Sequence, residues 1–150
     1  MAILEQFSLK GKVALVTGGA GLYGRQIVEA LAEAGAEVFM ASRGLDALRK
    51  TAETFAEAGL SVTPLQLDLG EESSILRLRD ELLERAGRID VLVNNAVLRP
   101  LTDAYQSSEE QFAASMRVNA TGLFLITRAF FRSVCSSTCG CRAGAWWAPG

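Results

Sequence analysis

The stretch TGGAGLYG at residues 17–24 decides the fold of this chain. It follows an apolar run, KVALVT at 12–17, and precedes a segment with helical periodicity that begins near residue 22. The spacing Gly-x-Gly-x-x-Gly between a strand and a helix predicts a dinucleotide site, whereas a plain glycine-rich loop is the alternative. Glycine allows a tight turn, close approach of a pyrophosphate and close helix packing, and the helix N-terminus offers free N–H groups to the anion. The candidate cofactor-binding residues here are Gly18, Gly19, Gly21, Tyr23 and Gly24.

The alternation of strand and helix continues along the chain. Short apolar runs predict strands at 12–17, 37–42, 61–67 and 90–94. Pro64 implies an edge position for the third strand, because proline cannot donate a ladder hydrogen bond. Each of the first three helices ends at an Ala-Gly pair, where glycine can adopt the left-handed conformation of a helix C-terminus. The pattern predicts an α/β fold, a Rossmann-like doubly wound parallel sheet with about four strands and four helices.

The composition excludes several classes of function. The chain has 150 residues, 49% of them hydrophobic, and a net charge of −2, which leaves no basic footprint for nucleic acid or an anionic membrane. No apolar run approaches the length of a membrane span, and the N-terminus does not resemble a signal peptide, so we expect a cytoplasmic protein. There is no histidine, which excludes histidine-based triads and histidine metal sites. No metal site is expected.

The end of the second predicted strand indicates which nicotinamide cofactor is preferred. An acidic residue about 20 positions after the glycine turn would bind the ribose 2′-hydroxyl of NAD. Ser42 and Arg43 stand there instead, and a hydroxyl and a guanidinium suit a 2′-phosphate. We therefore expect NADP(H), with NAD(H) as the alternative cofactor and a simple solvated loop as the alternative role of Arg43.

A long fourth helix is predicted to open with a capping box of Ser107 and Glu110. Asn119 interrupts its apolar stripe, and a buried amide needs hydrogen-bond partners. The asparagine either serves the active site or fixes the helix register in a homo-oligomer formed through this helix. The stripe comprises Phe112, Met116, Leu123, Ile126 and Phe130.

The glycine turn, LDL at 67–69, NNA at 94–96 and VNATGLF at 118–124 occur in this order, and with them residues 8–132 resemble the short-chain dehydrogenase/reductase family. The resemblance implies a dinucleotide cofactor and hydride transfer between nicotinamide and a small carbonyl or alcohol substrate. It places Asp68 and Leu69 at the adenine, Asn95 and Ala96 at the ribose, and Asn119 as a catalytic residue that supports a proton relay through a water. Leu22 and Val97 stand where most single-domain members have glycine.

The family's catalytic tyrosine and lysine, four residues apart, are not found in this chain. Its tyrosines are Tyr23 and Tyr105, and its lysines are Lys10, Lys12 and Lys50. Whether the chain is an enzyme is thus open, and we expect it to be inactive as written. Alternatives are a non-catalytic NADP(H)-binding module and a non-functional translation product. An incomplete sheet would also leave the fourth strand as a bare apolar edge.

The last residues, SVCSSTCGCRAGAWWAPG at 133–150, differ in composition from the rest. We expect residues 1–132 to form the NADP-binding portion and residues 133–150 an irregular tail outside the family pattern. Our hypothesis is a shift of reading frame near residue 133. A zinc or redox site at Cys135, Cys139 and Cys141 is an alternative, but it has no fourth ligand. An anchor through Trp146 and Trp147 is a third interpretation.

Overall fold

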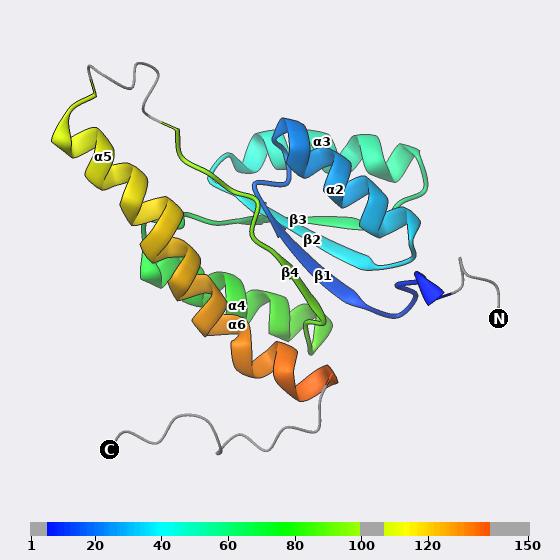
Figure 1. Cartoon of the computed structure of the whole chain (residues 1–150). Helices are drawn as coiled ribbons and strands as arrows, with labels where there is room; N and C mark the ends of the chain where they lie inside the picture. The colour runs from blue at the N-terminus through cyan, green and yellow to red at the C-terminus, as the bar shows by residue number, and fades with distance from the viewer. Residues whose placement is uncertain (1–5, 100–106, 139–150) are drawn as a thin grey trace, which may run out of the picture.

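The computed structural model describes residues 6–99 and 107–138, and a four-stranded parallel sheet lies at its centre (Figure 1). The strand order is β3-β2-β1-β4, so that β3 and β4 are the two edges. The predicted α/β class and the edge position of the proline-containing strand are both confirmed. The strands are β1 (Val13–Thr17), β2 (Glu37–Ser42), β3 (Val62–Gln66) and β4 (Val91–Val93).

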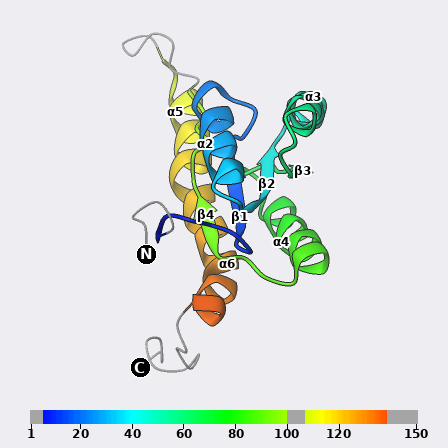
Figure 2. The same ribbon diagram turned by 90° about the vertical axis from the view of Figure 1, so that its right-hand side faces the viewer.

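Helices cover both faces of the sheet, with α2 and α3 on one side and α4 and α6 on the other (Figures 1 and 2). Their bounds are α2 (Leu22–Glu33), α3 (Leu45–Glu57), α4 (Glu72–Ala86), α5 (Glu109–Met116) and α6 (Leu123–Thr138), with a π-helical segment, η1 (Arg117–Gly122), between the last two. None of the helices in the described ranges is both long and apolar enough to cross a membrane.

Strand β1 is buried along its whole length because its alternate side chains enter two separate cores. Leu15 packs with residues of α4 and α6, including Ile75 and Phe130. Val16 points to the opposite face and packs with residues of α2 and α3, including Val28. The two-sided burial explains why β1 reads as a continuous apolar run instead of an alternating one.

The predicted ends of the first three helices are confirmed. Gly35, Gly59 and Gly87 have φ values of 96°, 77° and 71°, the left-handed region that favours glycine. The chain then reverses into the next strand within a few residues. These local stops keep the links short and align the strands in parallel.

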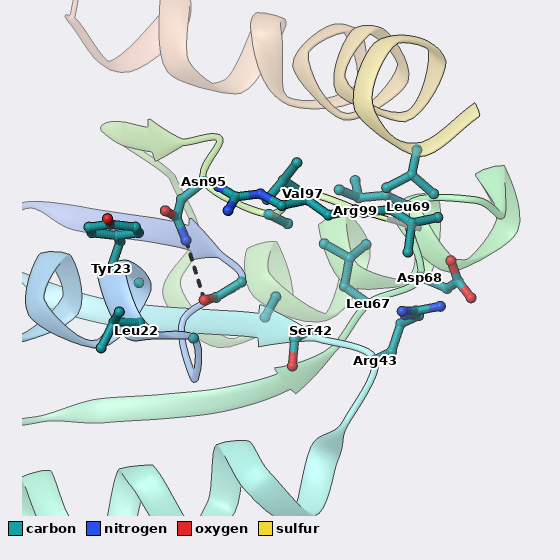
Figure 3. Close-up of a pocket in the computed structure, with 17 residues that line it drawn as sticks. Leu22, Tyr23, Ser42, Arg43, Leu67, Asp68, Leu69, Asn95, Val97 and Arg99 are labelled. Carbon is teal, nitrogen blue, oxygen red and sulfur yellow. Dashed lines mark hydrogen bonds between the residues drawn. The ribbon is translucent and has the colours of Figure 1, made fainter. Parts of the chain in front are cut away.

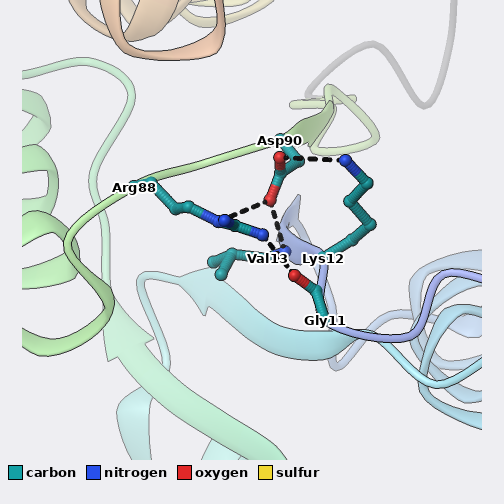
Figure 4. Close-up of polar contacts among 5 residues, drawn as sticks. All are labelled: Gly11, Lys12, Val13, Arg88 and Asp90. Carbon is teal, nitrogen blue, oxygen red and sulfur yellow. Dashed lines mark hydrogen bonds and ion pairs between the residues drawn. The ribbon is translucent and has the colours of Figure 1, made fainter. Parts of the chain in front are cut away.

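Asp90 joins the start of β1 to the start of β4 (Figure 4). Its side chain is 3% exposed, its Oδ2 accepts a hydrogen bond from the Val13 backbone N at 2.9 Å, and Arg88 Nε forms an ion pair with the same oxygen at 3.1 Å. Lys12 Nζ lies 3.5 Å from Oδ1, and Arg88 also donates to the carbonyl of Gly11. Burial disfavours the charged carboxylate, but the Val13 hydrogen bond and the two cations outweigh it and hold the pKa of Asp90 below its usual value.

The start of the fourth predicted helix differs from the prediction by one residue. Ser108, and not Ser107, is the N-cap: its Oγ accepts from the Gln111 backbone N at 3.3 Å, and Gln111 Oε1 accepts from Ser108 N at 2.9 Å. The capping box is therefore Ser108–Gln111 in place of Ser107–Glu110. The sequence contains two consecutive serines, each followed three residues later by Glu or Gln, so either serine could form a capping box.

The same helix is divided by the wider turn of η1, and this changes which of its apolar side chains are buried. Ile126 and Phe130 lie in the core, whereas Phe112, Met116 and Leu123 are exposed. The apolar stripe predicted from 3.6-residue spacing is therefore buried at Ile126 and Phe130, whereas Leu123 at the start of α6 is exposed together with the apolar residues of α5. A π turn shifts the helix face by about one residue, so the exposed apolar residues of α5 are out of line with the buried face of α6.

Helix α6 continues beyond the boundary expected at residue 132. Residues 133–138 are helical, and not irregular, through Thr138. Cys135 lies on this last part of α6, whereas the other tail residues named above, together with Tyr105, lie outside the described residues: Cys139, Cys141, Trp146 and Trp147. Across the residues that the structure describes, no three His, Cys, Asp or Glu side chains are grouped to hold a metal ion.

Candidate cofactor site

The glycine turn between β1 and α2 is packed so tightly that larger residues do not fit at two of its positions. A Cβ at Gly19 would lie 2.4 Å from Cβ of Met40 on β2, and a Cβ at Gly24 would lie 2.0 Å from the carbonyl oxygen of Gly18. Gly18 itself has a φ of 70° and lies against the backbone of Ala96. The turn is thereby held down on β2 and β4.

Gly21 differs from these glycines because it faces open space. It is exposed, and the one atom within 4 Å of an added Cβ is the Gly18 carbonyl oxygen at 3.2 Å. Gly21 is also the N-cap of α2, which has no side-chain cap and no acidic residue in its first turn. The uncapped N–H groups and the partial positive charge of the helix end are thus available to an anion.

Thr17 and Asn95 connect the glycine turn to the end of β4. Thr17 Oγ1 accepts hydrogen bonds from the backbone N of Asn95 and of Ala96, both at 3.0 Å, and donates to Val93 O at 3.3 Å. Asn95 Nδ2 donates to the carbonyls of Thr17 and Gly18, at 3.1 and 3.3 Å. Thr17 was not among the predicted site residues. Its signal was a hydroxyl at the end of an otherwise apolar strand, fully buried in the fold.

A cleft of about 480 Å³ opens where the carboxyl ends of the strands meet this turn (Figure 3). Ten of the eleven predicted cofactor-binding residues line it, and the exception, Gly19, is packed against Met40 beneath the turn. Four further residues line the cleft. Leu22 lies in the first turn of α2, and the other three lie in the segment after β4: Val97, Leu98 and Arg99. The ten predicted residues are Gly18, Gly21, Tyr23, Gly24, Ser42, Arg43, Asp68, Leu69, Asn95 and Ala96.

One end of the cleft is formed by the residues that follow β2 and β3. Ser42 is half-buried at the end of β2, and Arg43 is exposed beside it. Asp68 Oδ1 accepts a hydrogen bond from Gly70 N at 2.8 Å, and its own backbone N donates to Ser74 Oγ at 2.9 Å. Figure 3 shows Arg43 and Asp68 at the same end of the cleft. The carboxylate is thus oriented by its own loop, while the Arg43 guanidinium forms no ion pair with residues 6–99 or 107–138 and can contact a ligand.

Asn119 does not line the cleft but fixes a segment that does. Its Oδ1 accepts from Leu98 N at 2.8 Å, and its Nδ2 donates to Leu98 O at 2.8 Å and to Ser115 Oγ at 3.0 Å. The side chain therefore pairs with both backbone polar groups of Leu98. Through this pair, η1 sets the path of the chain after β4, next to Asn95 and Ala96.

A parallel sheet with a glycine turn and an open cleft at the carboxyl ends of its strands defines a Rossmann-like dinucleotide-binding fold. Similarity to known families identifies which family of dinucleotide-binding proteins this is. The model of the short chain dehydrogenases matches residues 12–141, and the chain belongs to this family of oxidoreductases.

Characterised relatives and solved structures agree with this assignment. The chain is 38% identical over 126 residues to sorbitol dehydrogenase of Cereibacter sphaeroides, covering 84% of this chain and 48% of that protein. A short-chain dehydrogenase/reductase structure from Mycobacterium marinum superposes with a TM-score of 0.84 at 32% identity, over 91% of this chain and 56% of that one.

A second solved structure, RhlG of Pseudomonas aeruginosa, is an NADP active-site complex. It matches with a TM-score of 0.80 at 33% identity, over 87% of this chain and 51% of that one. The chain spans about half the length of the curated relatives that it matches.

Proposed function

We propose that this chain is the NADP(H)-binding part of a short-chain oxidoreductase that transfers hydride between nicotinamide and a carbonyl or alcohol carbon. The observation that carries the proposal is the gathering of ten predicted cofactor residues in one cleft, with Arg43 where an NAD-binding protein has an acid. The NADP complex of RhlG, a relative of the same family, supports the choice of cofactor.

Each wall of the cleft has a distinct role in this proposal. The uncapped N-terminus of α2 and the open side of Gly21 receive the pyrophosphate. Arg43 and Ser42 bind the 2′-phosphate, while Asp68 and Leu69 border the adenine. Asn95 and Ala96 border the ribose, and Asn95 also holds the turn through Thr17 and Gly18. These groups bind and orient a cofactor, whose nicotinamide would donate or accept the hydride.

Asn119 is a positioning residue in this chain, because its amide is paired with the backbone of Leu98. A proton relay needs an acid–base group that delivers a proton to the substrate oxygen. No tyrosine among the 150 residues has a lysine four positions later. We therefore expect the chain as printed to bind NADP(H) without turnover.

Titration of the full chain with NADPH and NADH tests the proposal. We expect NADPH to bind more tightly than NADH and Arg43→Ala to weaken NADPH binding about tenfold, because a charge-assisted contact to the 2′-phosphate is lost. Binding of NADH, which has no 2′-phosphate, should change by less than about twofold.

Arg49→Ala is the matched control, because Arg49 is an exposed arginine on α3 that lies outside the cleft. The binding of both cofactors should be unaffected by it. If the wild-type chain binds neither cofactor, the proposed function is wrong. If Arg43→Ala weakens NADPH and NADH equally, the preference for NADP(H) is not due to Arg43.

A further inference from the structure

The segment after β4 contributes a second arginine to the cleft, Arg99, which neither the glycine motif nor the family resemblance assigns. We propose that the Arg99 guanidinium binds the pyrophosphate of the dinucleotide from the side opposite the glycine turn. The inference rests on the proposed function and adds a cofactor-binding residue to it.

The position of Arg99 is the first observation. It lines the same cleft as Gly18, Gly21 and Tyr23. In Figure 3 its side chain extends along the cleft in the direction of Asn95, the residue that donates to the Gly18 carbonyl and lines the same cleft. The cation is therefore directed back toward the glycine turn, away from the end of the cleft where Arg43 lies.

The second observation is that the charge of Arg99 has no carboxylate partner within residues 6–99 and 107–138. Arg79, Arg85, Arg88 and Arg128 each lie within 4.0 Å of an acid in this part of the chain, and Arg99 is not in such a pair. The carboxylate among the residues lining the cleft belongs to Asp68, which lies with Arg43 at the other end. An anion beside Asn95 would therefore meet the helix N-terminus on one side and a guanidinium on the other.

The third observation is that the backbone beside Arg99 is fixed. Both polar groups of Leu98 pair with the Asn119 side chain at 2.8 Å, so the root of the Arg99 side chain is held by η1. A guanidinium offers its donors in a rigid fork that matches phosphate oxygens. Fixing its root reduces the conformational freedom that is lost when the fork closes on a ligand.

Three probes distinguish the two ends of the cleft in the full chain. NADPH carries both the pyrophosphate and the 2′-phosphate, ADP carries a pyrophosphate alone, and 2′-AMP carries a 2′-phosphate alone. Affinity for NADPH is read from its fluorescence, and affinities for ADP and 2′-AMP are read from their competition with NADPH.

We expect Arg99→Ala to weaken NADPH and ADP about tenfold each and to leave 2′-AMP within about twofold. Arg43→Ala should show the opposite pattern, with NADPH and 2′-AMP weakened and ADP unchanged. Arg99→Lys, which keeps the charge without the fork, should retain part of the affinity. The melting temperature of Arg99→Ala should equal that of the wild type, because Arg99 is exposed.

The outcomes separate this inference from the function on which it rests. If the wild type binds NADPH and ADP and Arg99→Ala binds both equally well, the role of Arg99 is refuted and the proposed function stands. Equal weakening of ADP and 2′-AMP by Arg99→Ala would also refute it, because the residue would then act on the cleft as a whole. If the wild type binds none of the three probes, the proposed function itself fails.

Discussion

Replacement of Asp90 by asparagine should lower the stability of the fold by removing one buried negative charge. Asparagine keeps the size of the side chain and one oxygen, so the hydrogen bond from Val13 becomes a neutral one that is weaker by about 1 kcal/mol. Arg88 and Lys12 are 48% and 44% exposed, so solvent screening limits each ion pair to about 0.5 kcal/mol. Because asparagine also removes the desolvation cost of the buried charge, we expect the free energy of unfolding to fall by at most about 2 kcal/mol.

Urea denaturation followed by circular dichroism measures this loss. A decrease of about 2 kcal/mol corresponds to a fall in melting temperature of about 4–8 °C for a chain of this size. Asp80→Asn is the matched control, since Asp80 also pairs with an arginine, Arg79 at 2.7 Å, but is 66% exposed. Its free energy of unfolding should stay within about 0.5 kcal/mol of the wild type.

The pH dependence of the difference between wild type and Asp90→Asn gives an independent check. The pKa of Asp90 is lower in the folded chain than its usual value near 3.8. The unfolded chain therefore binds this proton more tightly, and the stabilisation by Asp90 is complete above about pH 5 and decreases as the pH falls below about 4. The two proteins should converge in stability toward acid pH.

Two results would refute this reasoning. If Asp90→Asn and Asp80→Asn lose the same small amount of stability, the buried carboxylate does not hold β1 and β4 together. If the difference from wild type is unchanged between pH 7 and pH 3, it arises from packing and not from the charge.

Two further pairs of variants test the glycine turn and the core. Gly24→Ala would place a Cβ 2.0 Å from the Gly18 carbonyl oxygen and should reduce the free energy of unfolding by about 3 kcal/mol, whereas Gly21→Ala, with 3.2 Å to the same atom and open space around it, should weaken NADPH binding with little change in the urea midpoint. Equal melting temperatures for the two variants would contradict this. Phe130→Ala removes a side chain that is fully buried and should cost about 3–5 kcal/mol, whereas Phe131→Ala, at a residue 63% exposed, should cost less than about 0.5 kcal/mol in the same denaturation assay. Similar losses would show that α6 does not pack on the sheet in this register.

The elements and the glycine turn could be predicted because their signals are local. The apolar run of β1 and the glycines at 35, 59 and 87 act through the backbone of their own neighbours. Pro64 gave the edge position for the same reason, since one missing N–H restricts where a strand can lie. Such signals do not depend on the rest of the fold.

Features that depend on distant contacts could not be predicted in this way. Thr17 and Asn95 are 78 positions apart in the chain, and nothing near either residue indicates their hydrogen bond. The extra residue in the turn of η1 likewise changes which face of the helix is buried. The sequence on both sides of η1 is typical of an ordinary α-helix and does not indicate this turn. The place of Arg99 in the cleft could not be predicted either, because the neighbouring Leu98 is held by Asn119, 21 positions further along the chain.

The short edge strand β4 has a consequence for how the protein responds to its ligand. Three ladder residues hold β4 on β1, yet the segment that follows it forms one wall of the cleft. A dinucleotide bound across the cleft would contact both the segment after β4 and the glycine turn after β1, and would therefore stabilise the edge strand β4 against the centre of the sheet. By mass action, ligand at 100 times its dissociation constant adds about 2.7 kcal/mol to the folded state. The fraction of molecules in which β4 is folded onto β1 would then depend on the concentration of the nucleotide, because ligand binding and folding of this edge are thermodynamically linked.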